Sequence, residues 1–306
     1  MITTFNTMLP SALPRSRARS SIIAVLSLAL VLALAGCSLL KLGYGQASPL
    51  AFRWLDGYVD FDDAQSLRVK AALDEAMAWH RRSELPDYVE LLGRAEAEVV
   101  GEATPERMCA WAKELRGRVD PVLQYVAPTI AEVALTLTPQ QIAHIETRFA
   151  ETNDEWRDEH LQRDPRKRRR AAVAREVERA ETLYGRLDDA QRELVARSVA
   201  ASPLDAELQL AERQRRQQEA LALIRRLREA NVGRDDAIVQ VRAYLHGIDR
   251  SSRESHQAYA DRLATYNCAF ASELHNATSA AQRRAAVKKL KGYETDLRAL
   301  IAEAAT

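Results

Sequence analysis

The sequence predicts an all-α protein, an elongated multi-helix bundle of long amphipathic helices. Hydrophobic residues make up 47% of the 306 residues but aromatic residues only 6%, so the residue types that favour strands are scarce. The 11 glycines and 10 prolines are too few for the many turns of a sandwich or barrel. Apolar residues recur every three or four positions along most of the chain, and no segment shows the alternation of a strand.

The charges of the chain nearly cancel. The 44 Lys and Arg residues face 43 Asp and Glu residues, which leaves a formal net charge of +1. Nucleic-acid-binding proteins usually carry a cationic surplus, so we expect no nucleic-acid partner. The apolar content is ample for a core, and we therefore expect a folded rather than a disordered chain.

The N-terminal residues predict export. An apolar run over residues 22–34 follows the basic residues Arg15, Arg17 and Arg19, and it is too short to span a membrane comfortably. The run ends in Leu34-Ala35-Gly36-Cys37, which resembles the lipobox of bacterial lipoproteins. The resemblance implies cleavage before Cys37 and acylation of this residue with fatty acids such as palmitate, which anchor the chain in a membrane. An ordinary signal peptide and an uncleaved anchor helix are the alternatives.

These features divide the chain into three predicted parts. We expect residues 1–36 to be a signal peptide that is removed, residues 37–48 to be a lipidated tether, and residues 49–306 to be a single all-helical periplasmic domain. Fully extended, the ten residues 39–48 reach about 35 Å, which would keep the domain near the lipid headgroups. Ser38 resembles the residue that directs lipoproteins to the outer membrane, so we expect the protein in the bacterial cell envelope, on that membrane.

The two cysteines after Cys37 predict a disulfide. Exported proteins meet an oxidising compartment, where two remaining cysteines usually pair. We therefore expect a disulfide between Cys109 and Cys268; the alternative is two buried free thiols.

Helix starts are marked along the chain by N-cap residues and by proline in the first turn. An aromatic-rich segment, residues 49–59, precedes them. Pro128 is expected to kink or restart a helix, because proline removes a backbone hydrogen bond. The spacing of these signals indicates roughly eight to ten helices. The predicted starts are Asp62, Pro86, Thr104-Pro105, Asp120-Pro121, Thr138-Pro139, Asp164-Pro165, Ser202-Pro203, Asp235 and Ser279.

Four helix starts share the pattern of a capping box, in which the first side chain accepts a backbone N–H and a glutamine three residues later bonds back. They show no fixed spacing and so do not indicate a solenoid repeat. Leu137-Thr138-x-x-Gln141 is also similar to the LTxxQ motif of the periplasmic Spy and CpxP proteins, which are small all-helical chaperones and stress modulators. Capping alone and a Spy-like relationship both remain open. The four boxes are Asp62-Asp63-Ala64-Gln65, Thr138-Pro139-Gln140-Gln141, Asp188-Asp189-Ala190-Gln191 and Ser279-Ala280-Ala281-Gln282.

A wider set of motifs, which begins at the lipobox, resembles a family of uncharacterised bacterial lipoproteins, a domain of unknown function. The resemblance implies an envelope location and an all-helical body, and it implies no reaction. The motifs after the lipobox are Trp54-Leu55-Asp56-Gly57-Tyr58-Val59-Asp60, Trp79-His80-Arg81-Arg82-Ser83-Glu84-Leu85-Pro86, Asn153-Asp154-Glu155-Trp156, Asn267-Cys268 and His275-Asn276-Ala277-Thr278 with Gln282-Arg283.

One group of polar residues is a candidate site. His80 and Glu84 lie four residues apart and would share a helix face, but Pro86 follows at once and the zinc pattern HExxH is absent. We favour a buried polar cluster that links the first helices to the turn after His275 over a metal or acid–base site. No nucleophile elbow, P-loop or dinucleotide-binding motif is present, so we expect neither an enzyme nor a cofactor. The candidate cluster comprises His80, Arg81, Arg82, Glu84, His275 and Asn276.

A run of cations forms a second candidate site near a predicted helix start. Such a run opposes the helix dipole, which suggests that it has a use. It could contact anionic lipid phosphates or an acidic protein. The alternative is a solvated helix start whose charges are balanced by Glu176, Glu178 and Glu181. The run comprises Arg166, Lys167, Arg168, Arg169 and Arg170.

Together these features favour a binding protein. We expect a lipoprotein that is anchored in the outer membrane through Cys37 and whose helical body binds envelope proteins, in a chaperone-like or stress-related role. A structural lipoprotein that tethers one dedicated partner complex is the first alternative. A metal-dependent or hydrolytic enzyme that uses His80 and Glu84 is the second. The sequence does not predict the oligomeric state.

Overall fold

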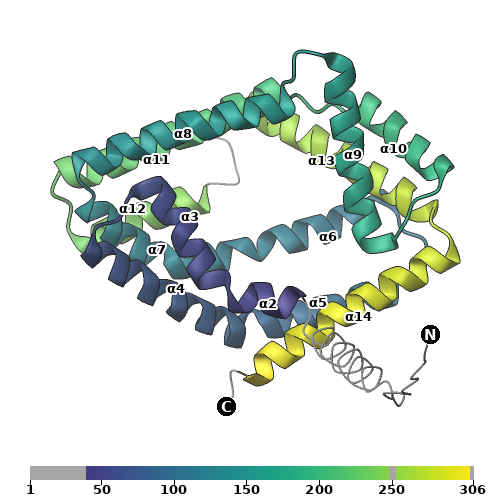
Figure 1. The fold of residues 1–306 in the computed structure, drawn as a ribbon, viewed down its shortest axis with the longest axis horizontal. Helices are drawn as coiled ribbons and strands as arrows, with labels where there is room; N and C mark the ends of the chain where they lie inside the picture. Colours follow the sequence, from purple (N-terminus) through teal and green to yellow (C-terminus); the bar gives the residue numbers. More distant parts are fainter. Residues whose placement is uncertain (1–38, 248–252, 304–306) are drawn as a thin grey trace, which may run out of the picture. The chain divides into compact units, whose positions relative to one another are not determined.

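The computed structural model describes residues 39–247 and 253–303 (Figure 1). Every regular element within these ranges is a helix, so the all-α prediction is confirmed. The chain forms two compact units, Met1–Tyr44 and Gly45–Thr306. The described part of the first unit belongs to helix α2 (Leu39–Gly45), while the predicted signal peptide 1–36 and Cys37 lie outside the described residues. None of the helices in the described ranges is both long and apolar enough to cross a membrane.

The described residues of the predicted tether are helical apart from Gln46. Helix α2 covers Leu39–Gly45, and α3 (Ala47–Val59) begins after this single intervening residue. The segment Leu39-Leu40-Lys41-Leu42 consists of good helix formers, which accounts for α2. Because a helix rises less per residue than an extended chain, these residues reach less far than the upper bound of about 35 Å.

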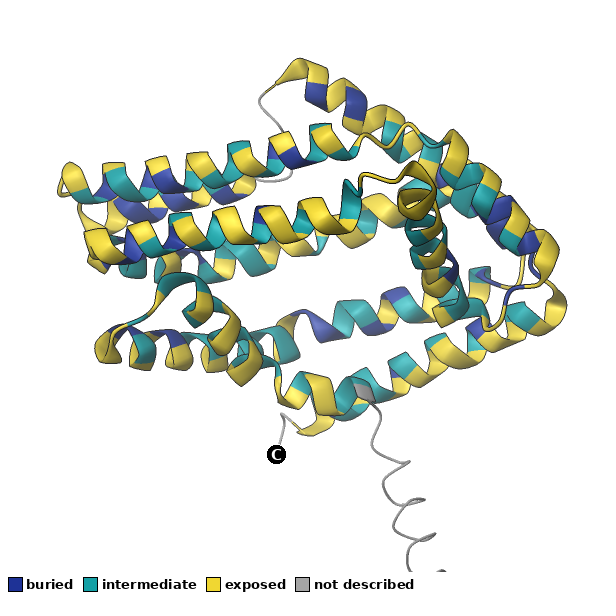
Figure 2. Ribbon diagram, turned by 45° about the horizontal axis from the view of Figure 1, so that its top comes forward, coloured by how far each residue is buried: buried dark blue, intermediate teal, exposed yellow. Residues whose placement is uncertain are grey.

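The Gly45–Thr306 unit contains the remaining helices. Their buried residues run as stripes, and each helix keeps an exposed face (Figure 2), as expected for amphipathic helices. After α3 they are α4 (Asp63–Ser83), α5 (Leu85–Glu98), α6 (Pro105–Gly117), α7 (Val119–Thr136), α8 (Pro139–His160), α9 (Pro165–Tyr184), α10 (Asp189–Ala201), α11 (Ala206–Glu229), α12 (Arg234–His246), α13 (Glu254–Asn276) and α14 (Ala280–Glu303).

Helices α3 to α8 and helices α9 to α14 repeat one packing scheme. In the first half α3 packs against α4 and α8, and α4 packs against α7. In the second half α9 packs against α10 and α14, and α10 packs against α13. Helices at equivalent positions in the two halves therefore make equivalent contacts within their own half.

The central helices of each half pack against the other half. Helices α5 and α6 contact α14 and α13, whereas α11 and α12 contact α8 and α7. Each half thus completes its packing with a helix pair that the other half supplies. In the Gly45–Thr306 unit the two halves exchange their central helix pairs reciprocally.

The largest buried cluster lies where α7 meets the exchanged helices α11 and α12. Ala127, Ala131 and Ala134 of α7 are almost fully buried there. Their small side chains allow the helix backbones to approach closely. Their partners are Leu223 and Leu227 of α11 with Ala237, Ile238, Val241 and Leu245 of α12.

The matching contact in the other half, between α13 and α6, carries the predicted disulfide. Cys109 of α6 and Cys268 of α13 are bonded, with their Cα atoms 5.2 Å apart and a sequence separation of 159. This prediction is confirmed. Because α6 belongs to the first half and α13 to the second, the disulfide joins the two halves covalently.

All four predicted capping boxes form, and the structure brings them together in two pairs. Gln65 Nε2 donates to Gln141 Oε1 at 3.3 Å, and Gln141 Nε2 donates to Gln65 Oε1 at 2.6 Å. Gln191 and Gln282 exchange the same two bonds at 2.8 Å each. These helix starts therefore do more than cap, because they join α4 to α8 and α10 to α14.

Each paired glutamine satisfies both its donors and its acceptor. The oxygen of each side chain also accepts the backbone N–H of its own N-cap residue, Asp62, Thr138, Asp188 or Ser279. The second N–H of each amide donates to a residue shortly before the opposite helix. Such fully satisfied amides, three of them buried, specify one arrangement of the helix ends. These acceptors are Thr136 Oγ1, Asp60 O, Ala277 O and Arg186 O.

Two local predictions differ from the structure. Pro128 lies inside α7 and does not end it, because the buried alanines on both sides hold this helix against α11 and α12. Residues 202–204 are not helical, and α11 begins at Ala206 with Asp205 as its N-cap. The Ser202-Pro203 signal therefore precedes the helix start instead of marking it.

Candidate functional site

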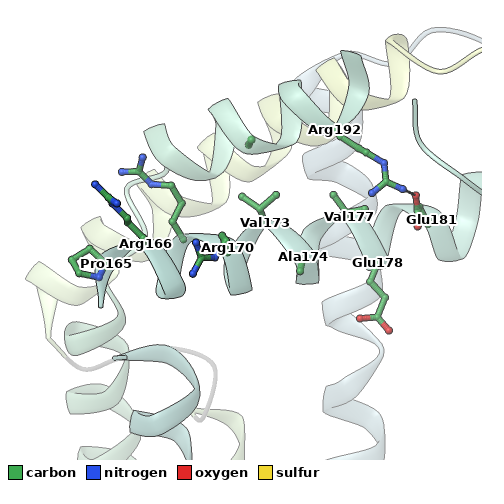
Figure 3. A pocket seen from close by; sticks show the side chains of 11 residues that line it. Pro165, Arg166, Arg170, Val173, Ala174, Val177, Glu178, Glu181 and Arg192 are labelled. Carbon is green, nitrogen blue, oxygen red and sulfur yellow. Dashed lines mark hydrogen bonds and ion pairs between the residues drawn. The ribbon is translucent and has the colours of Figure 1, made fainter. Parts of the chain in front are cut away.

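A groove along one face of α9 is a candidate site in the described residues. It has a volume of about 890 Å³ and is bordered by Arg192 and Ala196 of α10 (Figure 3). The remaining lining residues follow α9 at steps of three and four and so share one face of this helix. They are Pro165, Arg166, Arg169, Arg170, Val173, Ala174, Val177, Glu178 and Glu181.

The helices at the groove differ in length from their counterparts in the other half. Helix α9 has 20 residues where α3 has 13, and α10 has 13 residues where α4 has 21. Helix α9 is therefore about 10 Å longer than α10, against which it packs. Of α10, only Arg192 and Ala196 line the groove.

The charge on the lining residues changes along α9. Arg166, Arg169 and Arg170 are exposed at its start. Val173, Ala174 and Val177 form the apolar middle (Figure 3), in which Ala174 is exposed, Val173 is half-buried and Val177 is buried against the core cluster of α10. Glu178 is exposed beyond them. Lys167 and Arg168 belong to the same cationic run but do not line the groove.

The cations at the start of α9 are not balanced by the acidic residues that follow. Glu176 pairs with Arg179 at 2.9 Å, and Glu181 pairs with Arg192 and accepts the Leu187 backbone N–H. Within the described ranges, none of the five cations from Arg166 to Arg170 has an ion-pair partner. The run is therefore exposed and is not neutralised by direct ion pairs within the described residues.

The predicted polar cluster is divided between two places. His275, almost fully buried at the end of α13, hydrogen-bonds the Tyr184 hydroxyl through Nδ1 and the Gly101 carbonyl through Nε2, each at 2.8 Å. Asn276 bonds both the N–H and the carbonyl of Ala103, at 2.9 Å each. Burial raises the pKa of Tyr184 to about 12, so its hydroxyl stays protonated near neutral pH.

These bonds link α13 to the connection between α5 and α6. The predicted link between the first helices and the turn after His275 therefore exists, but the backbone of Gly101 and Ala103 makes it. His80 had been expected to make it. No sequence signal marks these backbone acceptors, because any residue provides a carbonyl.

His80 and Glu84 lie where α4 meets α5. The His80 ring contacts Trp79 and Tyr88, and burial lowers its pKa although the charge of Glu84 opposes this shift. Glu84 is buried, and its Oε2 has no hydrogen-bond partner in the described residues. Arg81 and Arg82 occupy the last turn of α4, so the chain continuity keeps these four predicted residues together at one corner.

No group of three or more His, Cys, Asp and Glu side chains in the described ranges is arranged to hold a metal ion. The buried carboxylate of Glu212 on α11 instead binds three arginines, Arg215, Arg216 and Arg253, which hold its pKa far below its usual range. Such a carboxylate surrounded by guanidinium groups is an ion cluster that joins α11 to α13.

Comparison with known proteins gives a family and no function. No curated protein and no solved structure matches the chain. The sequence model of one family, described as a family of unknown function (DUF6279), matches residues 57–246, which is more than half of the chain. The predicted resemblance to a domain of unknown function is confirmed at this level, and the chain belongs to the DUF6279 family.

Proposed function

We propose that this protein is a lipoprotein of the bacterial envelope, anchored in the outer membrane through Cys37, whose helical body binds other envelope proteins in a chaperone-like, non-catalytic role. The observation that carries the binding role is the open groove on α9, where an apolar floor adjoins cations without ion-pair partners. Exposed apolar surface that is rimmed by charge is typical of protein interaction sites. The lipobox and the LTxxQ-like helix starts are consistent with this location and role.

The chaperone-like role predicts many weak clients. The test uses the full chain reconstituted in lipid nanodiscs under oxidising conditions, with empty nanodiscs as the control. Light scattering follows several unrelated unfolded proteins as they aggregate, with the chain present from substoichiometric to equimolar amounts. We expect aggregation to be suppressed for more than one client.

A failure to suppress aggregation of any client would overturn the chaperone-like role. A structural lipoprotein that tethers one dedicated partner would then be the better proposal, and crosslinking in the intact envelope should capture one stoichiometric partner. Elemental analysis of protein prepared without chelators tests the enzyme alternative, because metal at one equivalent would contradict a non-catalytic role.

The lipid anchor is tested separately. Mass spectrometry of the mature chain should show an acylated N-terminal Cys37, and a Cys37→Ala variant should leave the outer-membrane fraction. An unmodified Cys37 within a longer mature chain would contradict the anchor. It would leave the groove and its binding role unaffected.

A further inference from the structure

The lining face of α9 has the dimensions of a helix-binding site. The residues from Arg166 to Glu181 span about 22 Å, which corresponds to about four turns of an α-helix. One long helix face beside the end of a second helix offers the ridges and grooves into which a third helix packs. Amphipathic helices bind such grooves through apolar residues that recur at steps of three and four.

The order of charges along the groove selects its partner. Arg166, Arg169 and Arg170 lie at one end, the apolar residues Val173 and Val177 follow, and a carboxylate, Glu178, lies beyond them (Figure 3). Glu181 is already paired with Arg192, so Glu178 is the acidic group left to face a ligand. The three cations exceed this single carboxylate, and an acidic partner is therefore favoured.

From this arrangement we infer that the α9 groove binds an amphipathic helical segment of a protein, with the acidic end of the segment against Arg166, Arg169 and Arg170 and its apolar residues on Val173, Ala174 and Val177. This inference rests on the proposed protein-binding function and specifies the partner of that site. A basic residue at the far end of the segment would meet Glu178.

An anionic membrane surface fits the groove less well than such a segment. Lipid phosphates would satisfy the arginines, but an acyl chain along the apolar floor would end beside the exposed carboxylate of Glu178. A flat bilayer would also contact Lys167 and Arg168 as readily as the groove arginines, because all five cations are exposed. A segment that enters the groove would contact the groove arginines but not Lys167 and Arg168.

This distinction provides a matched pair of variants. The groove variant combines Arg166→Gln, Arg169→Gln and Arg170→Gln, and the control variant combines Lys167→Gln and Arg168→Gln on the same helix. The probe is a fluorescent synthetic peptide of about sixteen residues, with Glu in its first turn, Leu and Ala in its middle and Lys in its last turn. A second peptide carries Gln in place of Glu.

Fluorescence anisotropy measures binding of each peptide to the full chain in nanodiscs. The groove variant should bind the Glu peptide about tenfold more weakly than the unaltered chain, because three exposed charge pairs are lost. The control variant should change the affinity by less than about threefold. The Gln peptide should bind the unaltered chain about as weakly as the Glu peptide binds the groove variant.

Three outcomes would overturn the inference. An equal loss of affinity for the Glu peptide in both variants would indicate general electrostatic attraction. Equal affinities of the unaltered chain for the Glu and Gln peptides would exclude recognition of the acidic end. Binding of phosphatidylglycerol vesicles by the full chain in detergent, without binding of the Glu peptide, would assign the cations to a membrane surface. An unchanged melting temperature of both variants shows that any loss is not due to unfolding.

The aggregation assay separates this inference from the proposed function. If the groove variant still suppresses aggregation and the peptides bind alike, the chaperone-like role stands and the groove is not its site. If neither peptide binding nor suppression is observed, the proposed function fails together with the inference.

Discussion

The two contacts through which the halves of the Gly45–Thr306 unit exchange helices have the same topology but different chemistry. Counted back from the capping boxes at Thr138 and Ser279, the buried residues of α7 have the same positions as three of the buried residues of α13. In α7 they are Ala127, Ala131 and Ala134, which pack against α12. In α13 they are Cys268, Ser272 and His275, which contact α6 and the connection before it.

The α7–α12 contact has a core of close apolar packing with ion pairs such as Arg234–Glu132 at its edge, while the α13–α6 contact is held by a covalent bond and hydrogen bonds. Apolar packing depends on side-chain volume and is insensitive to oxidation. The disulfide depends on the redox conditions. One packing scheme therefore accepts two kinds of contact, and only the second responds to reduction.

Removal of the disulfide should produce the largest difference in stability between the α13–α6 and α7–α12 contacts. Combining Cys109→Ala with Cys268→Ala should lower the free energy of unfolding by about 2–5 kcal/mol, because the bond closes a long loop in the unfolded chain. Denaturant unfolding measures this value, and hydrogen exchange locates the effect. Amides of α6 should exchange faster while those of α12 stay protected; equal acceleration in both would show that the two contacts do not differ in this way.

Side-chain volume should matter more at the apolar contact. Ala131→Leu places a larger side chain at a fully buried position and should cost about 3 kcal/mol. At the equivalent position Ser272→Ala removes the 2.7 Å bond from Oγ to the Ala103 carbonyl and should cost about 1 kcal/mol, since Asn276 still donates to that oxygen. Thermal unfolding of the two variants checks the order. A smaller loss for Ala131→Leu would contradict close packing of α7.

The two glutamine pairs should also differ in strength. Gln65→Ala leaves Gln141 buried without its partner and should cost about 2–3 kcal/mol. Gln191→Ala should cost about 1 kcal/mol less, because Gln282 is only partly buried and water can replace the lost bond. Gln140→Ala, at an exposed position beside Gln141, is the control and should be nearly neutral. Equal costs for Gln65→Ala and Gln191→Ala would mean that burial of the partner does not decide the difference.

The smallest effect should be an alkaline pH dependence that arises from Tyr184 of α9, whose hydroxyl bonds His275 beside the α13–α6 contact. The pKa of Tyr184 is about 12 in the folded chain and about 10 when unfolded, so its contribution to stability is complete below pH 10. It is lost as the pH rises towards 12, because the unfolded chain then binds fewer protons than the folded chain. Between pH 9 and pH 11 the free energy of unfolding should therefore fall by about 1–2 kcal/mol less in Tyr184→Phe than in the unaltered chain, as measured by denaturant unfolding at both pH values. An unaltered alkaline slope in this variant would contradict the assignment.

Much of the fold could be predicted from local signals, whereas the pairing of its parts could not. The caps at Asp62, Thr104, Thr138, Asp164 and Asp188 depend on neighbouring residues, and each begins a helix as expected. Which capping box meets which depends on contacts between residues far apart in the sequence, and four nearly identical motifs do not specify their partners. The disulfide could be predicted because the number of cysteines left one choice.

The candidate site shows the same division. The cationic run from Arg166 to Arg170 is visible in the sequence, but its separation into groove and non-groove cations depends on where α10 ends. His275 and Asn276 were expected to be polar anchors and are so, yet their partners are mainly backbone atoms, which carry no sequence signal. Groups of residues from one helix could therefore be predicted, and their partners on other helices could not.

The exchange of central helix pairs constrains how the chain reaches its folded state. As the polypeptide is synthesised, α5 and α6 emerge long before α13 and α14, the helices that cover them. Early contacts with α4 and α7 are available to them, but their main partners α13 and α14 are absent until nearly the whole chain is present, and such partly folded states are prone to aggregation and proteolysis. A chain truncated before Ala280 would lack the helix that packs against α5. Packing of residues that are made early therefore depends on the helix that is made last.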